Sequence, residues 1–407
     1  MMSPHPSRQR AERRGLNLPP VGPVLAATFA AAVLVASTVF YLTWTLLGAR
    51  GLEPEGKVDA KTLFDMVKLA FGVVAGAGAL VALVVTYRRQ RVDEDGALRD
   101  ATRLHTERFT AAVTQLEASP PVRLGGVHAL AGLADDAPTR ALRQTCIDVL
   151  CAYLRLPYTA EPDTPADTPA RHEYLALREV RHTAIRLIRD HLRLPEEHPH
   201  SWQGHDFDFT GAIFDGGDFS QTTFSAGKVD FTRAQFSGGT VDFGGAKFSG
   251  ATAYFTHSEI TRSKVHFNEA EFSGGTIYFN RAQVSAGKVD FTRAQFSGSK
   301  VRFSWAQFSG GTVNFTSAEF SGATVLFDRA SFSGGTAQFT SAQFSGGTVN
   351  FHEATLADGV SFNGAQFTGG TADLGTAHGT PPAGLPLGGL TPPPAGLVLP
   401  PAWCLTP

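Results

Sequence analysis

Large apolar residues recur along residues 209–374 with gaps that alternate between five and seven positions. One twelve-residue phrase carries them, as in Val289–Lys300 and again in Val313–Thr324. Neither the 3.6-residue period of an amphipathic helix nor the two-residue period of a plain strand gives these gaps. A short period repeated this often predicts a solenoid, in which the chain turns a corner between successive phenylalanines.

A second apolar residue stands two positions before each phenylalanine, Val in one half of the repeat and Ala in the other. Residues i−2 and i of an extended segment share a face, so both should point inward. Each unit then has two five-residue sides, such as Val289–Arg293 and Ala294–Gly298, followed by a dipeptide, Ser299–Lys300. A coil of about 24 residues predicts roughly seven coils at about 4.8 Å each, a rod on the order of 35 Å long.

At the start of this region, Ala212–Gly216 and Gly217–Gln221 follow the pattern Ala-(Asp/Asn)-(Leu/Phe)-X-X. This pattern resembles the pentapeptide-repeat proteins, and the resemblance implies a right-handed quadrilateral parallel β-helix over residues 201–374. From Phe224 onward the sequence departs from the family pattern, because the dipeptide lengthens every second side. We interpret this as extra perimeter for Val, which is bulkier than Ala at the inward position. The family resemblance is specific for fold and nearly silent on function.

The N-terminal region predicts a membrane anchor. Residues 1–20 are basic and expected to be disordered. Within residues 21–91, the apolar runs Val21–Leu47 and Leu69–Tyr87 carry no charge and predict a hairpin of two transmembrane helices. A signal peptide is the weaker alternative, because the first run is too long and no small-residue cleavage site follows it.

Basic residues flank both predicted spans on the outer sides of the hairpin, at Arg8, Arg10, Arg13 and Arg14 and at Arg88, Arg89 and Arg91. By the positive-inside rule, both termini and the β-helix face the cytoplasm. These features predict a two-pass protein of the bacterial cell (plasma) membrane, with the lipid bilayer as one partner.

Residues 92–200 are expected to form a helical linker domain. Apolar spacing predicts four helices, at Leu98–Leu116, Val122–Ala134, Thr139–Leu156 and Arg171–Leu194, and the first could continue the second membrane helix. Pro121–Leu133 resembles a helix of a HEAT or armadillo unit. Pro-rich Glu161–Pro169 separates the last two helices. After Leu374, residues 375–407 are rich in Gly and Pro and predict a disordered tail or a loose strand over the last coil.

The sequence offers no catalytic, cofactor-binding or metal site, and no cofactor is expected. Phosphate-binding, nucleophile-elbow and kinase motifs are absent. His198, His200 and His205 lie in a segment broken by prolines, so solvated or hydrogen-bonded histidines are favoured over zinc ligands. Cys146 and Cys151 are expected to be buried free thiols. Repeated aspartates are interpreted as a solvated outer face, at Asp230, Asp242 and Asp290.

These features favour a membrane-anchored, non-enzymatic scaffold whose β-helix binds an unidentified protein or further copies of the same chain. The family resemblance also implies an alternative, a DNA mimic that binds topoisomerases. That role requires a strongly acidic rod, whereas residues 201–374 hold 15 Asp and Glu against 11 Lys and Arg. No nucleic-acid partner is therefore expected. A second alternative is a relay of a membrane signal, although neither apolar run contains an ionisable residue.

Overall fold

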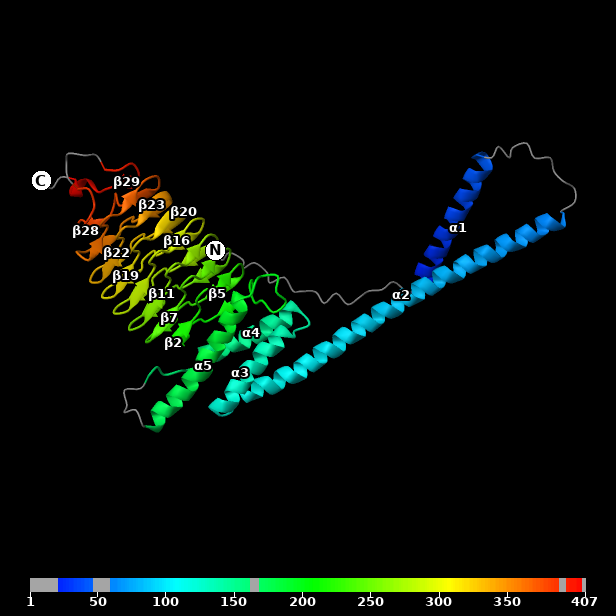
Figure 1. Cartoon of the computed structure of the whole chain (residues 1–407), viewed down its shortest axis with the longest axis horizontal. Helices are drawn as coiled ribbons and strands as arrows, with labels where there is room; N and C mark the ends of the chain where they lie inside the picture. Colours follow the sequence, from blue (N-terminus) through cyan, green and yellow to red (C-terminus); the bar gives the residue numbers. More distant parts are fainter. Residues whose placement is uncertain (1–20, 47–58, 162–167, 388–392, 405–407) are drawn as a thin grey trace, which may run out of the picture. The chain divides into compact units, whose positions relative to one another are not determined.

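The N-terminal part of the protein is helical (Figure 1). The computed structural model describes residues 21–46, 59–161, 168–387 and 393–404, and its two compact units divide between Ala101 and Thr102. The first unit contains helix α1 (Val21–Leu46) and most of helix α2 (Ala60–Gln115). The basic segment 1–20, the loop 47–58 and the linker residues 162–167 lie outside the described residues.

Helix α2 is one continuous helix of 56 residues. It includes the predicted span Leu69–Tyr87 and most of the predicted helix Leu98–Leu116. Apolar side chains of the span are exposed, with Phe71 70% exposed. Of the described helices, α2 alone is long and apolar enough to cross a membrane by length and composition. The expectation of two transmembrane helices therefore has support from one candidate helix.

Three shorter helices follow in the second unit, α3 (Pro120–Asp135), α4 (Arg140–Arg155) and α5 (Pro169–Arg193). Each begins where the sequence supplies a start signal: prolines occupy the first turns of α3 and α5, and the Thr139 hydroxyl accepts a hydrogen bond from the Leu142 N–H. Their apolar faces meet in a core that contains Leu130, Leu150 and Ile188, all fully buried.

The remaining chain forms a parallel β-solenoid of about eight turns. Its short strands stack in four columns, one for each side of the coil (Figure 1). Column one contains β1 (Phe207–Asp208), β5 (Lys228–Asp230), β9 (Thr252–Tyr254), β13 (Thr276–Tyr278), β17 (Lys300–Arg302), the second halves of β20 (Glu319–Leu326) and β23 (Gln343–Asn350), β27 (Thr371–Asp373) and β29 (Leu397–Val398). Column two contains β2 (Ile213–Phe214), β6 (Gln235–Phe236), β10 (Glu259–Ile260), β14 (Gln283–Val284), β18 (Gln307–Phe308), β21 (Ser331–Phe332), β24 (Thr355–Leu356) and β28 (His378–Gly379).

The other two sides of the coil complete the four-sided cross-section. Column three contains β3 (Gly217–Asp218), β7 (Thr240–Asp242), β11 (Lys264–His266), β15 (Lys288–Asp290), β19 (Thr312–Asn314), β22 (Thr336–Gln338) and β25 (Val360–Ser361). Column four contains β4 (Thr223–Phe224), β8 (Lys247–Phe248), β12 (Glu271–Phe272), β16 (Gln295–Phe296), the first halves of β20 and β23, and β26 (Gln366–Phe367). Columns one and four join through β20 and β23, which run across the corner between them.

The register between coils confirms the predicted 24-residue coil. Val265 pairs with Val289, and the same step recurs through the middle of the solenoid. The first coil advances by 22 residues, from Phe207 to Val229, because its opening sides lack one dipeptide. The first strand begins at Phe207, within the predicted range 201–374, but the solenoid continues beyond Leu374, so it has about eight turns where the sequence predicted roughly seven.

Phenylalanine fills the interior. Phe243, Phe267 and Phe291 are fully buried, and successive rings in this column are stacked, with centroids 4.9 Å apart and planes within 7°. A dry cavity of about 20 Å³ lies where Ile260 and Val284 take the place of phenylalanine in column two. The inward Phe, Val and Ala columns are thus confirmed, and they leave no room for a substrate inside the coil.

The inserted dipeptide lies at a corner. In Ser299–Lys300, Lys300 extends strand β17, while buried Ser299 completes the turn before it. These Ser-Gly-X corners stack backbone upon backbone. A Cβ added to Gly274 would lie 2.1 Å from the carbonyl oxygen of Ser249 in the coil before. Glycine at this position is therefore a requirement of the close approach between coils.

Of the two expectations for the C-terminal segment, a disordered tail or a loose strand over the last coil, the described part agrees with the strand. Strand β29 pairs with β27 of the last coil, and the 3-10 helix η2 (Pro401–Trp403) follows it. Leu385, Leu397 and Trp403 are buried against the solenoid. The apolar interior of the coil would meet solvent at the end of the last coil, and these three side chains cover it. Residues 388–392 and 405–407 of the predicted tail lie outside the described residues.

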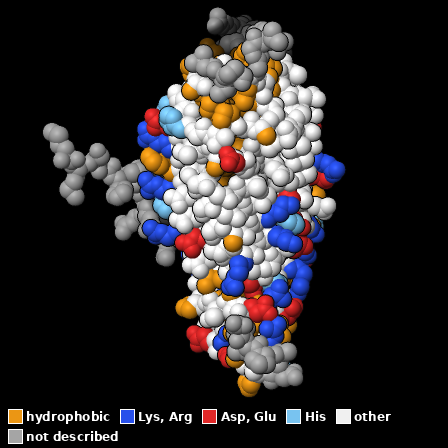
Figure 2. Space-filling model, turned by 90° about the vertical axis from the view of Figure 1, so that its left-hand side faces the viewer, with side chains coloured by type: hydrophobic (Ala, Val, Ile, Leu, Met, Phe, Trp, Pro, Cys, Tyr) orange, Lys and Arg blue, Asp and Glu red, His pale blue; other side chains and the backbone are white. Residues whose placement is uncertain are grey.

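Uncharged polar side chains cover much of the solenoid surface. Figure 2 shows a broad face with few charged side chains, and along one of its edges Lys, Arg and His side chains lie in a row. Column two has this character, because its outward residues include the uncharged Gln283, Gln307 and Ser331.

The corner glycines predict a large difference between two otherwise similar substitutions. Gly274→Ala should lower the free energy of unfolding by about 1–3 kcal/mol, because its Cβ overlaps the backbone of the coil before it. Gly238 occupies the equivalent Ser-Gly position at the corner between columns two and three, yet a Cβ there meets no atom within 4 Å. Urea unfolding of both variants, followed by circular dichroism, measures the difference. Equal destabilisation would show that the corners do not limit coil packing.

Candidate interaction surface

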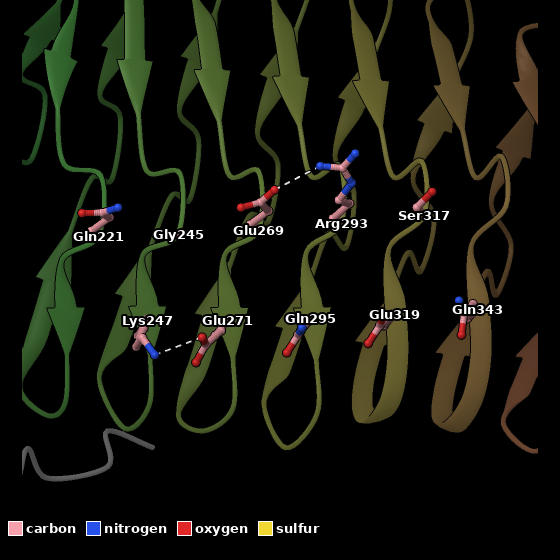
Figure 3. A pocket seen from close by; sticks show the side chains of 10 residues that line it. All are labelled: Gln221, Gly245, Lys247, Glu269, Glu271, Arg293, Gln295, Ser317, Glu319 and Gln343. Carbon is pink, nitrogen blue, oxygen red and sulfur yellow. Dashed lines mark hydrogen bonds and ion pairs between the residues drawn. The ribbon is translucent and has the colours of Figure 1, made fainter.

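A polar groove runs along the solenoid over six successive coils (Figure 3). It is open, encloses about 730 Å³, and lies between one row of corners and the strands of column four. We call it the polar groove, and it is lined by Gln221, Gly245, Lys247, Glu269, Glu271, Arg293, Gln295, Ser317, Glu319 and Gln343. Amides, carboxylates, two basic groups and a hydroxyl alternate along it, with no apolar side chain at its lining.

The corner row of the polar groove has a left-handed backbone. Gln221, Glu269, Arg293 and Ser317 have φ between 56° and 59°, and the side chain three residues earlier fixes the turn. The Asn314 Oδ1, for example, accepts a hydrogen bond from the Thr316 N–H at 3.0 Å. Each coil therefore presents one corner side chain directly above that of the previous coil.

Opposite charges pair between neighbouring coils within the groove. The Lys247 Nζ lies 3.0 Å from Glu271, and the Arg293 Nη1 lies 3.1 Å from Glu269 (Figure 3). These exposed pairs contribute little to stability, about 0–1 kcal/mol each. Among the described residues, the exposed Glu319 carboxylate has no ion-pair partner. The groove is thus a mixed polar surface that can exchange its internal partners for those of a bound molecule.

The repeat aspartates differ from the predicted solvated face. Asp230 and Asp290 are 8% and 5% exposed, and each carboxylate lies within 2.7 Å of the Nζ of Lys228 or Lys288. Burial acts to raise the pKa of Asp290, but hydrogen bonds from Lys288 and Thr292 outweigh it and lower that pKa. These aspartates bind the corner backbone two residues on, so their role is structural.

A buried cluster around Asp215 joins the helices to the first coil. The Tyr158 and Tyr174 hydroxyls donate hydrogen bonds to Asp215 Oδ2 at 2.7 and 2.6 Å, and His182 Nε2 lies 3.3 Å from Oδ1. Burial acts to raise the pKa of Asp215, but His182 and the two tyrosines outweigh it and lower that pKa. Burial and the same carboxylate raise the pKa of Tyr174 to about 12.

This cluster contains acid and base groups, yet its bonds are made within the protein. Both Asp215 oxygens are occupied, and Arg178 Nε lies 3.3 Å from Oδ2. The carboxylate is 5% exposed at the floor of a surface hollow of about 720 Å³ that Tyr174 and Arg178 also line. The cluster therefore serves to hold helix α5 on the first coil of the solenoid.

The three candidate histidines have different surroundings. His205 is buried, and its Nδ1 lies 2.8 Å from Gln144 Oε1. Burial, helped by Arg140 and Arg143, lowers the pKa of His205 to about 4. His198 and His200 are exposed, and their rings contact each other edge to face at 5.4 Å. The structure brings His198 and His200 together but not His205, and no group of three potential metal ligands occurs among the residues it describes.

The two helical cysteines are buried and free, as expected. Burial raises the pKa of Cys146 to about 11 and that of Cys151 to about 12, so both thiols stay protonated and unreactive at neutral pH. Cys404, at the C-terminal end of the described chain, is exposed.

Comparison with known families agrees with the geometry. A family model described as "Pentapeptide repeats (9 copies)" matches residues 327–378, which lie within the solenoid. The solenoid is a pentapeptide-repeat domain. Neither the curated proteins nor the solved structures include a match to the chain. No enzyme family is indicated, and pentapeptide-repeat solenoids are in general not enzymes.

Sequence reasoning missed both the polar groove and the Asp215 cluster. The groove of the pentapeptide-repeat domain has no motif of its own, but alignment of the sequence at steps of 24 residues places Lys247, Glu271, Gln295 and Glu319 in one row. The Asp215 cluster joins residues 33–57 positions apart in sequence, on a helix and a coil. No local pattern marks such a contact.

Buried His205 predicts a loss of stability on mild acidification. Its unfolded pKa is about 6.5, whereas its folded pKa is about 4, so between these values the unfolded state binds more protons. The free energy of unfolding therefore falls as pH decreases through this window. His205→Gln should flatten the dependence, and His172→Gln, at an exposed position of helix α5, should retain it. Urea unfolding at several pH values provides the measurement, and identical slopes in all three proteins would refute the assignment.

Proposed function

We propose that this protein is a membrane-anchored, non-enzymatic scaffold whose pentapeptide-repeat domain binds another protein on the cytoplasmic side. The observation that carries the proposal is the contrast between a fully packed interior and a long open groove. Phenylalanine stacks close the coil to substrates, whereas the polar groove presents polar side chains from six successive coils. Such a surface suits the binding of a protein far better than the enclosure of a small molecule.

Helix α2 supports the membrane anchor. Its segment Leu69–Tyr87 contains no charged residue, and none of its most apolar window is buried within the protein. Helix α1 adds 26 uncharged residues. Arg88, Arg89 and Arg91 follow the apolar part of α2, as expected for a cytoplasmic boundary. With basic residues also before α1, we place both termini and the solenoid in the cytoplasm of a cell with a two-pass plasma-membrane anchor.

The groove favours an extended polar segment as its ligand. Unpaired Glu319 and the displaceable Lys247–Glu271 pair offer acceptors and donors at each step of the coil. A second copy of the chain could supply such a segment, so self-association is one outcome of the binding test. A DNA-mimicking role is not favoured, because Lys247 and Arg293 interrupt the negative charge that imitation of a duplex needs.

Membrane anchoring predicts resistance to extraction. The full chain should remain in the membrane fraction after washing with alkaline carbonate, because apolar spans stay in lipid when electrostatic contacts are lost. External protease applied to intact spheroplasts should leave the pentapeptide-repeat domain uncut, and the same protease should reach it after detergent treatment. Release of the chain by carbonate, or cleavage of the domain in intact spheroplasts, would contradict the assigned topology.

The polar groove predicts that charge reversal changes the set of bound proteins. Glu319→Arg should reduce the labelling of a defined group of neighbours by at least about tenfold, the effect of about 1.4 kcal/mol lost at a contact. Proximity labelling in the native cell, with the enzyme fused to the full chain, measures this set. The matched control is Glu259→Arg, which reverses an equally exposed carboxylate on column two. Unchanged labelling in Glu319→Arg would remove the groove as the binding surface.

A further inference from the structure

The second row of corners in the pentapeptide-repeat domain lies between columns one and two. It presents one residue per coil, and all six have a left-handed backbone with φ between 51° and 62°. We call this row the basic edge, and it consists of Arg233, His257, Arg281, Trp305, Arg329 and Glu353. Stacked coils place successive members about 4.8 Å apart along a nearly straight line. Figure 2 shows basic side chains arranged in such a row along one edge.

The cations of the basic edge are available for binding. Arg233 and Arg281 are exposed, and neither guanidinium has a hydrogen-bond or ion-pair partner among the described residues. Arg329 pairs with Glu353 at 2.5 Å, at the far end of the row. Because Glu353 is the only acidic member, the row carries a net positive charge, although residues 201–374 are acidic as a whole.

Aromatic residues accompany these charges. Trp305 is 49% exposed and, with Val398, is one of two exposed large apolar side chains in the described solenoid. Arg329 lies over its ring at 4.9 Å. On the neighbouring column, the rings of Tyr254 and Tyr278 stack at 5.0 Å.

The outer faces of that tyrosine pair are also covered, by Lys228 at 5.3 Å from the ring of Tyr254 and by Arg302 at 5.8 Å from the ring of Tyr278. The ring faces are thus occupied by the protein's own groups.

This arrangement discriminates between polyanions. Single-stranded nucleic acids bind by stacking successive bases on open aromatic faces, whereas the faces of Tyr254 and Tyr278 are already covered and Arg329 lies over the Trp305 ring. An acidic peptide is best held in a groove, whereas this row is a projecting corner. A lipid surface, in contrast, is flat and continuous, and it favours Trp and Tyr at the headgroup level together with Lys and Arg.

We propose that the basic edge binds the anionic lipid surface of the membrane in which the chain is anchored. The polar groove lies along the opposite corner row, so this contact would leave it free for a partner. The inference rests on the proposed membrane anchoring. Basic residues near such a surface are attracted to its anionic headgroups, so Arg233 and Arg281 can hold the edge against it once the anchor keeps the domain close by.

The test follows the environment of Trp305. The full chain is reconstituted into vesicles of phosphatidylcholine, or of phosphatidylcholine with phosphatidylserine, that contain lipids brominated near the headgroup. Tryptophan quenching is measured with and without Trp305→Phe, and the difference isolates Trp305 from the other three tryptophans. We expect Trp305 to be quenched in the phosphatidylserine vesicles only, and high salt to abolish the quenching.

Two charge reversals locate the contact. Arg281→Glu should abolish the quenching, and the fold should tolerate it because Glu353 occupies the equivalent corner with φ of 51°. Lys264→Glu changes the net charge equally on column three, two sides away, and should leave the quenching intact. Circular dichroism checks that both variants are folded. Equal quenching in neutral vesicles, or equal effects of the two reversals, would overturn the proposal.

Flotation of the full chain with neutral vesicles tests the anchor separately. If the chain does not float, the proposed anchoring fails, and the same quenching difference is then measured with chain added to the vesicles from solution. Protection of Trp305 by poly-glutamate or by an oligonucleotide, with no response to phosphatidylserine, would assign the edge to an acidic protein or to a nucleic acid and overturn the lipid assignment.

Discussion

The stacking of one coil directly on the next is the constraint from which the rest of the solenoid follows. In the middle of the solenoid, phenylalanine rings lie nearly parallel to the ring 24 residues later, as Phe267 does on Phe291 at 4.9 Å. On all four sides, backbone hydrogen bonds pair residues that are 24 positions apart in sequence. Rings cannot remain in contact unless every coil has the same perimeter, and the corners must therefore repeat as strictly as the core. Glycine at the Ser-Gly corners and the left-handed residue at the alternate corners both result from this requirement.

A stack of this kind must end, and both of its ends are covered. At the first coil, Ile185 of helix α5 lies against Gly217, and the Asp215 cluster fixes the helix there. At the last coil, Trp403 and Leu397 cover the apolar cross-section. The two caps differ in kind, because one is a folded helical layer and the other is a short returning segment. Without them, two apolar ring layers and two sets of unpaired strand edges would meet water.

Much of this architecture is readable from the sequence because the repeat is local. The alternating gaps between phenylalanines specify the inward columns, and the start signals near Pro120 and Thr139 specify helix ends to within a few residues. The features that were predicted wrongly depend on contacts between distant segments. Asp230 and Asp290 appear as solvated residues in a pattern, but neighbouring Lys and Thr side chains bury them. For the tail, composition left two alternatives open, disorder or a loose strand, because the apolar end that Leu397 covers exists only once the coils are stacked.

The half-coil repeat has a consequence for how such a domain can change in length. Insertion or loss of 24 residues adds or removes one complete rung, and every outward row keeps its place on the same side. Insertion of 12 residues is just as compatible with the phenylalanine ladder, because both halves bury Phe at the same spacing. It would, however, rotate all later residues by half a turn, so that Ser317 would continue the row of Arg233 and Trp305 would continue the row of Glu269. A duplication that leaves the packing of the core unchanged would therefore exchange the sides on which the corner residues of the polar groove and of the basic edge lie, beyond the point of insertion.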